Sequence, residues 1–260
     1  MPALFLGHGS PMNAIEDNPC SREWAALGRR LPRPRAILCI SAHWETHGIH
    51  VSAGAQPETI HDFHGFPKAL FDVRYPAPGS PELARRVAEL IGTAPGSHRV
   101  HLDPDRGLDH GAWSVLRPMY PQADIPVVQL SLDSARPGDF HLALGQRLAP
   151  LREEGVLILG SGDIVHNLRL YSLHRTAAMD WALRFRTLAN RLIENGDDQA
   201  LADYPALGAD AQLAIPTPEH YLPLLYVLGA RRADERPVLF NDMVTSSLSM
   251  TSILYGAPAA

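Results

Sequence analysis

The chain has 260 residues, of which 45% are hydrophobic and 20% charged, so it can bury a sizeable core and is not mainly disordered. Its formal net charge of -5 excludes the basic surface that would attract nucleic acid or an anionic membrane. No apolar run reaches roughly 18 residues and no signal peptide is recognisable. We therefore expect a soluble cytoplasmic protein with no membrane and no nucleic-acid partner.

Short apolar runs, bounded by proline, glycine or polar residues, predict buried strands along the whole chain. They lie at residues 3–7, 36–41, 48–54, 127–132, 156–162, 237–240 and 252–255. Between them, apolar residues recur at helical spacing. The predicted helices lie at residues 21–31 (with Ser21 as N-cap), 80–92, 138–152, 176–195 and from Thr217 onward.

This alternation of strands and helices predicts one α/β domain over residues 1–260. We expect a single central mixed sheet, largely parallel, with helices on both faces and the two late strands as antiparallel additions. Residues 54–79 hold no clear element, and a loop of this length in a compact domain is usually functional or mobile.

Thirteen histidines are the informative feature of the composition, because histidine is the commonest metal ligand and transfers protons near neutral pH. His8, His43 and His166 follow predicted strands, and His110 stands at the apparent start of a helix. Ligands of open α/β sheets bind beyond the carboxyl ends of the strands. One such histidine is more often structural than a ligand, but four at converging ends predict a common site.

His220 opens the helix that Thr217 and Pro218 are expected to begin. The helix dipole would disfavour a protonated histidine there, so His220 should stay neutral, as a metal ligand must. A half-exposed histidine without a role is an equally good interpretation of this position. The sequence contains no HExxH or CxxC motif, and two cysteines make no disulfide framework.

The loop histidines His61 and His64 lie beside two phenylalanines, Phe63 and Phe66, the second of them in a Gly-Phe-Pro turn, which predicts a pocket wall able to stack on an aromatic ligand. A loop that packs its own phenylalanines explains the pattern as well. The remaining histidines are expected to be structural or exposed: His47, His50, His98, His101, His141 and His174.

Seven sequence blocks together resemble the class III extradiol ring-cleaving dioxygenase superfamily, and within it the DOPA-type branch. They follow the family order and cover nearly the whole chain. The blocks are FLGHGSPMNA (5–14), ILCISAHWET (37–46), TIHDFHGFPKALFDVRYPAPGSPELA (59–84), GLDHGAWSVLRPMYP (107–121), SGDIVHNL (161–168), PTPEHYLPLLYVLGA (216–230) and SMTSILYG (249–256).

The resemblance implies an α/β fold around a mixed sheet and one divalent metal ion, with ligands that map onto His8, His43 and His220. His166 is implied either as a further ligand or as an acid/base. The third ligand of the wider class is usually a carboxylate, a place that the resemblance assigns here to His220, with Glu219 beside it. A set of three histidines suits zinc as well as Fe(II), so we expect zinc in the isolated protein and Fe(II) in the working enzyme.

The resemblance also implies the reaction, in which a catechol-type substrate such as L-DOPA is opened by O2 next to the diol, giving a muconic semialdehyde. Neutral His166 would accept a proton and His110 would stabilise developing charge or donate one, while His61, His64 and Phe66 border the ring. The protein is expected to be a monomer or weak homodimer. Two alternatives stay open: a zinc hydrolase with His166 or Glu219 as base, and a non-catalytic metal-binding protein.

Overall fold

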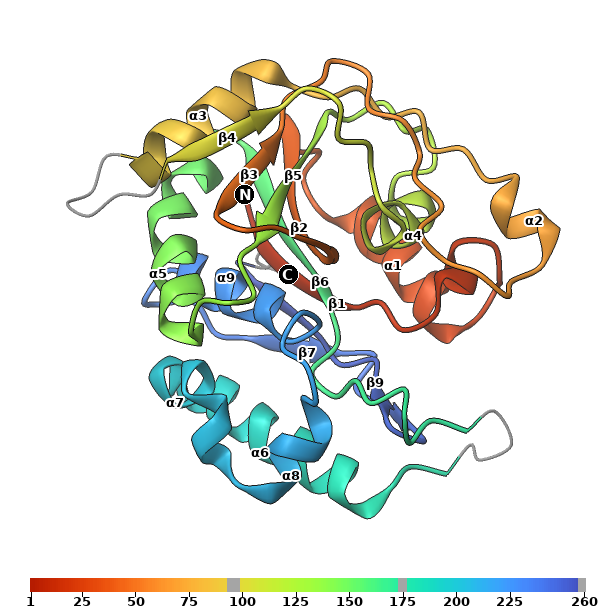
Figure 1. Cartoon of the computed structure of the whole chain (residues 1–260), viewed down its shortest axis with the longest axis vertical. Coiled ribbons are helices and arrows are strands. Elements are labelled where there is room, and N and C mark those ends of the chain that lie inside the picture. Colours follow the sequence, from red (N-terminus) through yellow and green to blue (C-terminus); the bar gives the residue numbers. More distant parts are fainter. Residues whose placement is uncertain (93–98, 173–176, 257–260) are drawn as a thin grey trace.

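An eight-stranded sheet forms the centre of the computed structural model, which describes residues 1–92, 99–172 and 177–256 (Figure 1). The strands are β1 (Ala3–Gly7), β2 (Ala36–Glu45), β3 (Ile49–Ser52), β4 (Val100–Asp103), β5 (Val127–Leu132), β6 (Val156–Gly162), β7 (Val238–Phe240) and β10 (Ser252–Tyr255). Their order across the sheet is β4-β3-β5-β2-β6-β1-β10-β7.

The middle of the sheet is parallel, since β2 pairs in parallel with β5 and β6, and β6 with β1. These strands are near-continuous apolar runs, as expected for strands buried on both faces. At one edge β10 pairs antiparallel with β1, and β7 with β10; at the other, β3 pairs antiparallel with β5 and parallel with β4. The predicted mixed sheet with late antiparallel additions is confirmed.

Two apolar cores, one on each face, hold helices against the sheet. On one face Leu4 and Leu6 of β1 share a core with α1 (Pro19–Arg30) and α4 (His110–Met119). On the other, Phe5 packs in a core with the remaining long helices. Alternate residues of one strand thus point into the cores on opposite faces of the sheet. The other helices of six or more residues are α3 (Pro81–Gly92), α5 (Gly138–Leu148), α6 (Asp180–Asn195), α8 (Ala209–Ala214) and α9 (Leu222–Ala230).

The remaining elements are short. They are η1 (Pro11–Ala14), α2 (Lys68–Phe71), η2 (Ala149–Arg152), α7 (Asp198–Ala202), η3 (Tyr204–Leu207), β8 (Val244–Thr245) and β9 (Leu248–Ser249). The segment 54–79 holds only the single turn α2, as its lack of periodicity indicates. No helix within the described ranges combines the length and hydropathy that a membrane span needs.

Several predicted boundaries were wrong for local reasons. Helix α1 is capped by Asn18, and Ser21 is its partner in the capping box, three residues into the turn. The helix expected from Thr217 begins at Leu222, because the Thr217 hydroxyl donates to Glu219 (2.9 Å) instead of capping. The predicted helix 138–152 ends at Leu148 and continues as η2.

Strand β2 is longer than expected and β4 was not predicted. A bulge opposite β5 lets β2 continue past Ile40, so that His43 lies inside the strand and not behind it. Helix α6 ends at Asn195, before the left-handed Gly196, as predicted, and it starts at Asp180. Its predicted start at residue 176 lies outside the described residues, as do His98 and His174.

A buried ion pair connects the start of the chain to the end of α9 and the loop before β7. Arg152, 1% exposed, donates to Glu235 (2.7 Å), to the Ala230 carbonyl (2.8 Å) and to the Met1 carbonyl (2.8 Å). Arg152→Met would remove the donor of the Ala230 and Met1 carbonyls and leave Glu235 with Arg232 as its cationic partner (3.1 Å), and we expect a loss of about 1.5 to 3 kcal/mol in the free energy of unfolding.

Urea unfolding measures this loss. Arg22→Ala is the control, because its pair with Asp17 is exposed and should change stability little. An Arg152→Met protein as stable as the parent would show that this pair does not hold the fold together.

Candidate active site

The carboxyl ends of β1 and β6 and the turn before α9 are joined by backbone hydrogen bonds. The His8 N–H donates to the Gly162 carbonyl (2.9 Å), and the Asp163 N–H donates to the His220 carbonyl (2.8 Å). A Cβ on Gly162 would lie 2.1 Å from the His220 carbonyl oxygen, so the approach requires glycine. These ties place His8 and His220 on one rigid frame.

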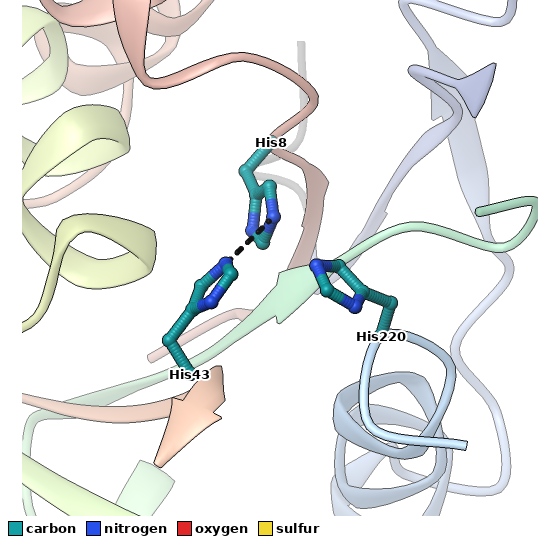
Figure 2. A group of neighbouring side chains, drawn as sticks. All are labelled: His8, His43 and His220. Carbon is teal, nitrogen blue, oxygen red and sulfur yellow. Dashed lines mark hydrogen bonds between the residues drawn. The ribbon is translucent and has the colours of Figure 1, made fainter. Parts of the chain in front are cut away.

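Three histidines point their rings into one space, as Figure 2 shows for His8, His43 and His220. One nitrogen of each ring lies within 4.8 Å of the others. The Nε2 atoms of His8 and His43 are 3.3 Å apart. The structure thus brings together the three histidines expected to bind a metal.

Hydrogen bonds fix which nitrogen of two of these rings is free. The Ser161 hydroxyl donates to the Gly111 carbonyl (2.6 Å), so it accepts from Nδ1 of His8 (3.0 Å) and leaves the lone pair on Nε2. Glu219 accepts from Nδ1 of His220 (3.0 Å), with the same result. Such partners orient metal-binding histidines and raise their basicity.

Burial keeps these imidazoles neutral. It holds the pKa values of His8 and His220 well below the ordinary histidine range, and the neighbouring histidines lower them further. Burial and the adjacent His110 lower the pKa of His43 to about 4. Neutral imidazole is the form that binds metal, so the ring nitrogens need no deprotonation near neutral pH. Burial, and not the helix dipole predicted for His220, is the cause.

His110 stands at the first position of α4, which Asp109 caps through the Ala112 N–H (3.1 Å). Asp62 from the long loop accepts from both the backbone N–H (3.0 Å) and Nδ1 (2.9 Å) of His110. Burial tends to raise the pKa of Asp62, but the hydrogen bonds and charge of His110 bring it below its usual value. The His110 ring centroid is 3.8 Å from that of His43, so this Asp–His pair borders the cluster.

His166 lies flat against His220. Their ring centroids are 3.4 Å apart and the ring planes differ by 6°. The His166 N–H donates to the Ala214 carbonyl (2.9 Å), which fixes the backbone of this segment. Burial lowers the pKa of His166 to about 4, so this ring is neutral as well. The structure therefore places all four strand-end and helix-end histidines, with His220, in one site.

Asp163 was missed as a site residue. It is 1% exposed, and its Oδ1 accepts from the Gly9 N–H (3.1 Å) while Oδ2 lies 3.4 Å from Nε2 of His8. Burial raises the pKa of this carboxyl well above its usual value. The signal in the sequence was its position, because Asp163 follows β6 directly, just as His8 follows β1.

A buried polar network under His43 was also missed. Asp109 accepts from the Ser41 hydroxyl (2.7 Å), the Gln129 amide (2.7 Å) and Arg106 (3.0 Å). Arg106 also donates to the His43 carbonyl (3.3 Å). The network fixes the end of β2 and thereby the position of His43, but its members come from three separate segments that no local motif connects.

The predicted pocket wall lies partly beside the cluster. His61 is half-buried, donates through Nε2 to the Val73 carbonyl (3.0 Å) and packs near Trp113, whereas His64 is exposed. Phe66 packs edge-on against Phe63, with ring centroids 5.4 Å apart. The loop phenylalanine that packs against the cluster is Phe63, edge-on to His110 with ring centroids 5.5 Å apart. Phe63 was part of the predicted wall but was not among the residues expected to border the substrate.

The other described histidines lie away from this centre. His141 is buried and bonded to the Tyr226 hydroxyl (3.1 Å), which makes it structural. His47 and His101 are exposed and His50 is half-buried. The expectation that these four are structural or exposed is consistent with their positions.

Comparison with known proteins identifies the group to which this site belongs. Residues 2–255 match the family model described as the catalytic LigB subunit of aromatic ring-opening dioxygenase. The chain belongs to this family. Family members are metal-dependent and act on an aromatic substrate with O2, and the chain is accordingly an extradiol ring-opening dioxygenase. The predicted family and enzyme class are confirmed.

Relatives in this family are similar over nearly their full length. The chain is 50% identical to 4,5-DOPA dioxygenase extradiol of Escherichia coli (strain K12), covering 98% of this chain and 95% of the relative. It is 42% identical to the protein of the same name from Beta vulgaris, covering 92% and 90%. A crystal structure of an uncharacterized protein from Escherichia coli K12 shares 44% identity, with a TM-score of 0.85 and coverage of 98% and 100%.

The family membership decides between the alternatives that the sequence left open. A zinc hydrolase and a non-catalytic metal-binding protein are both disfavoured, because the full length of the chain aligns with ring-opening dioxygenases. The fold class expected from the sequence is confirmed by the similar crystal structure as well.

Proposed function

We propose that the protein opens the ring of a catechol such as L-DOPA next to its diol, with both atoms of O2 entering a muconic semialdehyde product. His8, His43 and His220 would hold one Fe(II) ion, and the isolated protein would carry zinc. The protein would act in the cytoplasm as a monomer or weak homodimer. The relatives named 4,5-DOPA dioxygenase extradiol support the choice of substrate.

The donor set fits a divalent metal. Three neutral imidazoles face one space, those of His8 and His220 buried and that of His43 half-buried, and the proton positions of His8 and His220 leave lone pairs on the nitrogens that face it. Fe(II) bound there would lower the pKa of the catechol hydroxyls and supply the redox couple that O2 requires, which zinc lacks.

We assign His166 as an acid/base because its ring stacks on that of His220. A ring nitrogen's lone pair lies in the ring plane, and two parallel rings with centroids 3.4 Å apart cannot aim their lone pairs at one atom about 2.1 Å from each. His166 is thus left to accept a proton from a catechol hydroxyl, for which its neutral state prepares it.

The Asp62–His110 pair lies at the opposite border of the cluster. The Asp62 carboxylate accepts from Nδ1 of His110, so it orients the ring and places a negative charge beside it. His110 can then donate a proton, or a hydrogen bond, to oxygen as negative charge develops there. Phe63 packs edge-on against this ring. His61, His64 and Phe66 would border the ring or its substituent.

Asp62→Asn tests the role of this pair. The amide can accept one of the two hydrogen bonds of His110, but it does not stabilise a positive charge, so we expect kcat to fall by about 10- to 100-fold. KM should change less, because Asp62 contacts His110 and not the substrate. Steady-state kinetics with the iron-loaded protein measures both constants. An unchanged kcat would show that the reaction does not need the charge of Asp62.

The proposed reaction is tested by product formation. The metal-stripped protein is loaded anaerobically with Fe(II) and mixed with L-DOPA and a panel of other catechols in air. The expected result is a yellow semialdehyde whose mass equals that of the substrate plus O2. If no catechol yields such a product at full iron occupancy, the proposed substrate class is wrong.

A further inference from the structure

Two ring nitrogens, one of His8 and one of His43, and a carboxyl oxygen of Asp163 meet at the centre of the site. The His8 proton is on Nδ1, bonded to Ser161, so Nε2 faces the site as an acceptor. Nε2 of His43 lies 3.3 Å from it, and Oδ2 of Asp163 lies 3.4 Å from it. This Oδ2 is buried and has no hydrogen-bond partner within the described part of the chain.

An unpartnered, buried carboxylate oxygen is costly, and most such groups in proteins are bonded to a donor or bound to a metal. Asp163 cannot easily turn away from this position. Its Oδ1 accepts from the Gly9 N–H (3.1 Å), and its own N–H donates to the His220 carbonyl (2.8 Å). Both ends of the residue are therefore anchored to the segments that carry His8 and His220.

The spacing of these atoms matches that of ligands on one ion. Atoms about 2.1 Å from a tetrahedral metal ion lie about 3.4 Å from one another. The 3.3 Å between the two Nε2 atoms and the 3.4 Å between Nε2 of His8 and Oδ2 of Asp163 both agree with this value.

We propose that Asp163 is a fourth protein ligand of the metal in the substrate-free enzyme, bound through Oδ2 beside His8, His43 and His220. This inference rests on the proposed function, which places a divalent metal among the three histidines. A carboxylate among histidine ligands reduces the charge of the site by one and resembles the donor set that suits Fe(II) oxygen chemistry.

Asp163→Asn separates metal binding from folding. The amide oxygen can still accept from the Gly9 N–H, and its NH2 group can donate to Nε2 of His8. The metal-free variant should therefore melt at the same temperature as the metal-free parent, or higher. Its zinc affinity should fall by more than the 10- to 100-fold loss typical of groups that only orient a ligand.

Zinc alone is the probe, with affinity measured by competition with a chromophoric chelator. Co(II) is substituted in parallel, because the position and intensity of its visible bands report the ligand set. Asp163→Ala, which removes both oxygens, should show the same loss of affinity and the same altered Co(II) spectrum. Asp198→Asn is the matched control: this aspartate also has an unpartnered buried oxygen but pairs with Arg231, and both measurements should stay unchanged.

The outcomes are distinguishable. Weaker zinc binding with a changed Co(II) spectrum in both Asp163 variants supports the proposal. Parental affinity, or weaker binding with the parental Co(II) spectrum, overturns it and leaves the proposed function intact. A parent protein that binds neither metal would instead contradict the metal site itself.

Discussion

Replacing His166 by glutamine is expected to lower kcat for ring cleavage by about 100- to 10,000-fold, the usual range for loss of a general acid or base. The metal content should stay at about one ion per chain. The ring of His166 is parallel to that of His220, so the two rings cannot bind the same ion. Glutamine retains polarity and much of the volume but cannot accept a proton at neutral pH.

Two measurements on the same preparation decide this prediction: metal analysis after gel filtration, and oxygen uptake after iron loading. His101→Gln is the control, because this histidine is exposed and is not part of the histidine cluster. If His166→Gln loses the metal along with activity, His166 is primarily a ligand, and our interpretation of the stacked rings is wrong.

His8→Ala should remove both the metal and the activity. Nε2 of His8 lies 3.3 Å from Nε2 of His43 and 3.4 Å from Oδ2 of Asp163, so it is at the centre of the proposed donor set. We expect metal affinity to fall by more than about 100-fold, beyond the loss expected when only an orienting partner is removed. Oxygen uptake should fall to the level of the buffer.

The matched control is Ser161→Ala, which removes the hydroxyl that holds the His8 tautomer and leaves the ligand itself. That variant should bind metal about 10- to 100-fold more weakly and regain activity at high Fe(II) concentration. Chelator competition measures both affinities. Full metal occupancy in a folded His8→Ala protein would show that His8 is not a ligand.

The sheet and much of the site could be predicted because their signals are local. Apolar runs such as residues 3–7 and 156–162 form parallel strands buried on both faces, and the histidines after them meet at one edge for that reason. The position of His110 at a helix start could be predicted in the same way, from the cap that Asp109 supplies.

What could not be predicted depends on contacts between distant segments. The Thr217 hydroxyl bonds to Glu219, so the helix starts later than its capping signal indicates. Asp62 and Phe63 reach His110 from a loop without periodicity, and nothing in their local sequence marks that contact. The lone pair of Asp163 becomes meaningful only once His8 is placed 3.4 Å from it.

Oxygen consumption tests the central claim most directly. The metal-stripped protein is reloaded anaerobically with either Fe(II) or zinc, and oxygen uptake is recorded on addition of L-DOPA. We predict about one O2 consumed per molecule of substrate with iron, accompanied by the yellow product, and no uptake with zinc. If the fully iron-loaded protein consumed no more oxygen than the zinc-loaded protein, with L-DOPA and with the other catechols, the assignment of this histidine cluster as a ring-cleaving iron site would be contradicted.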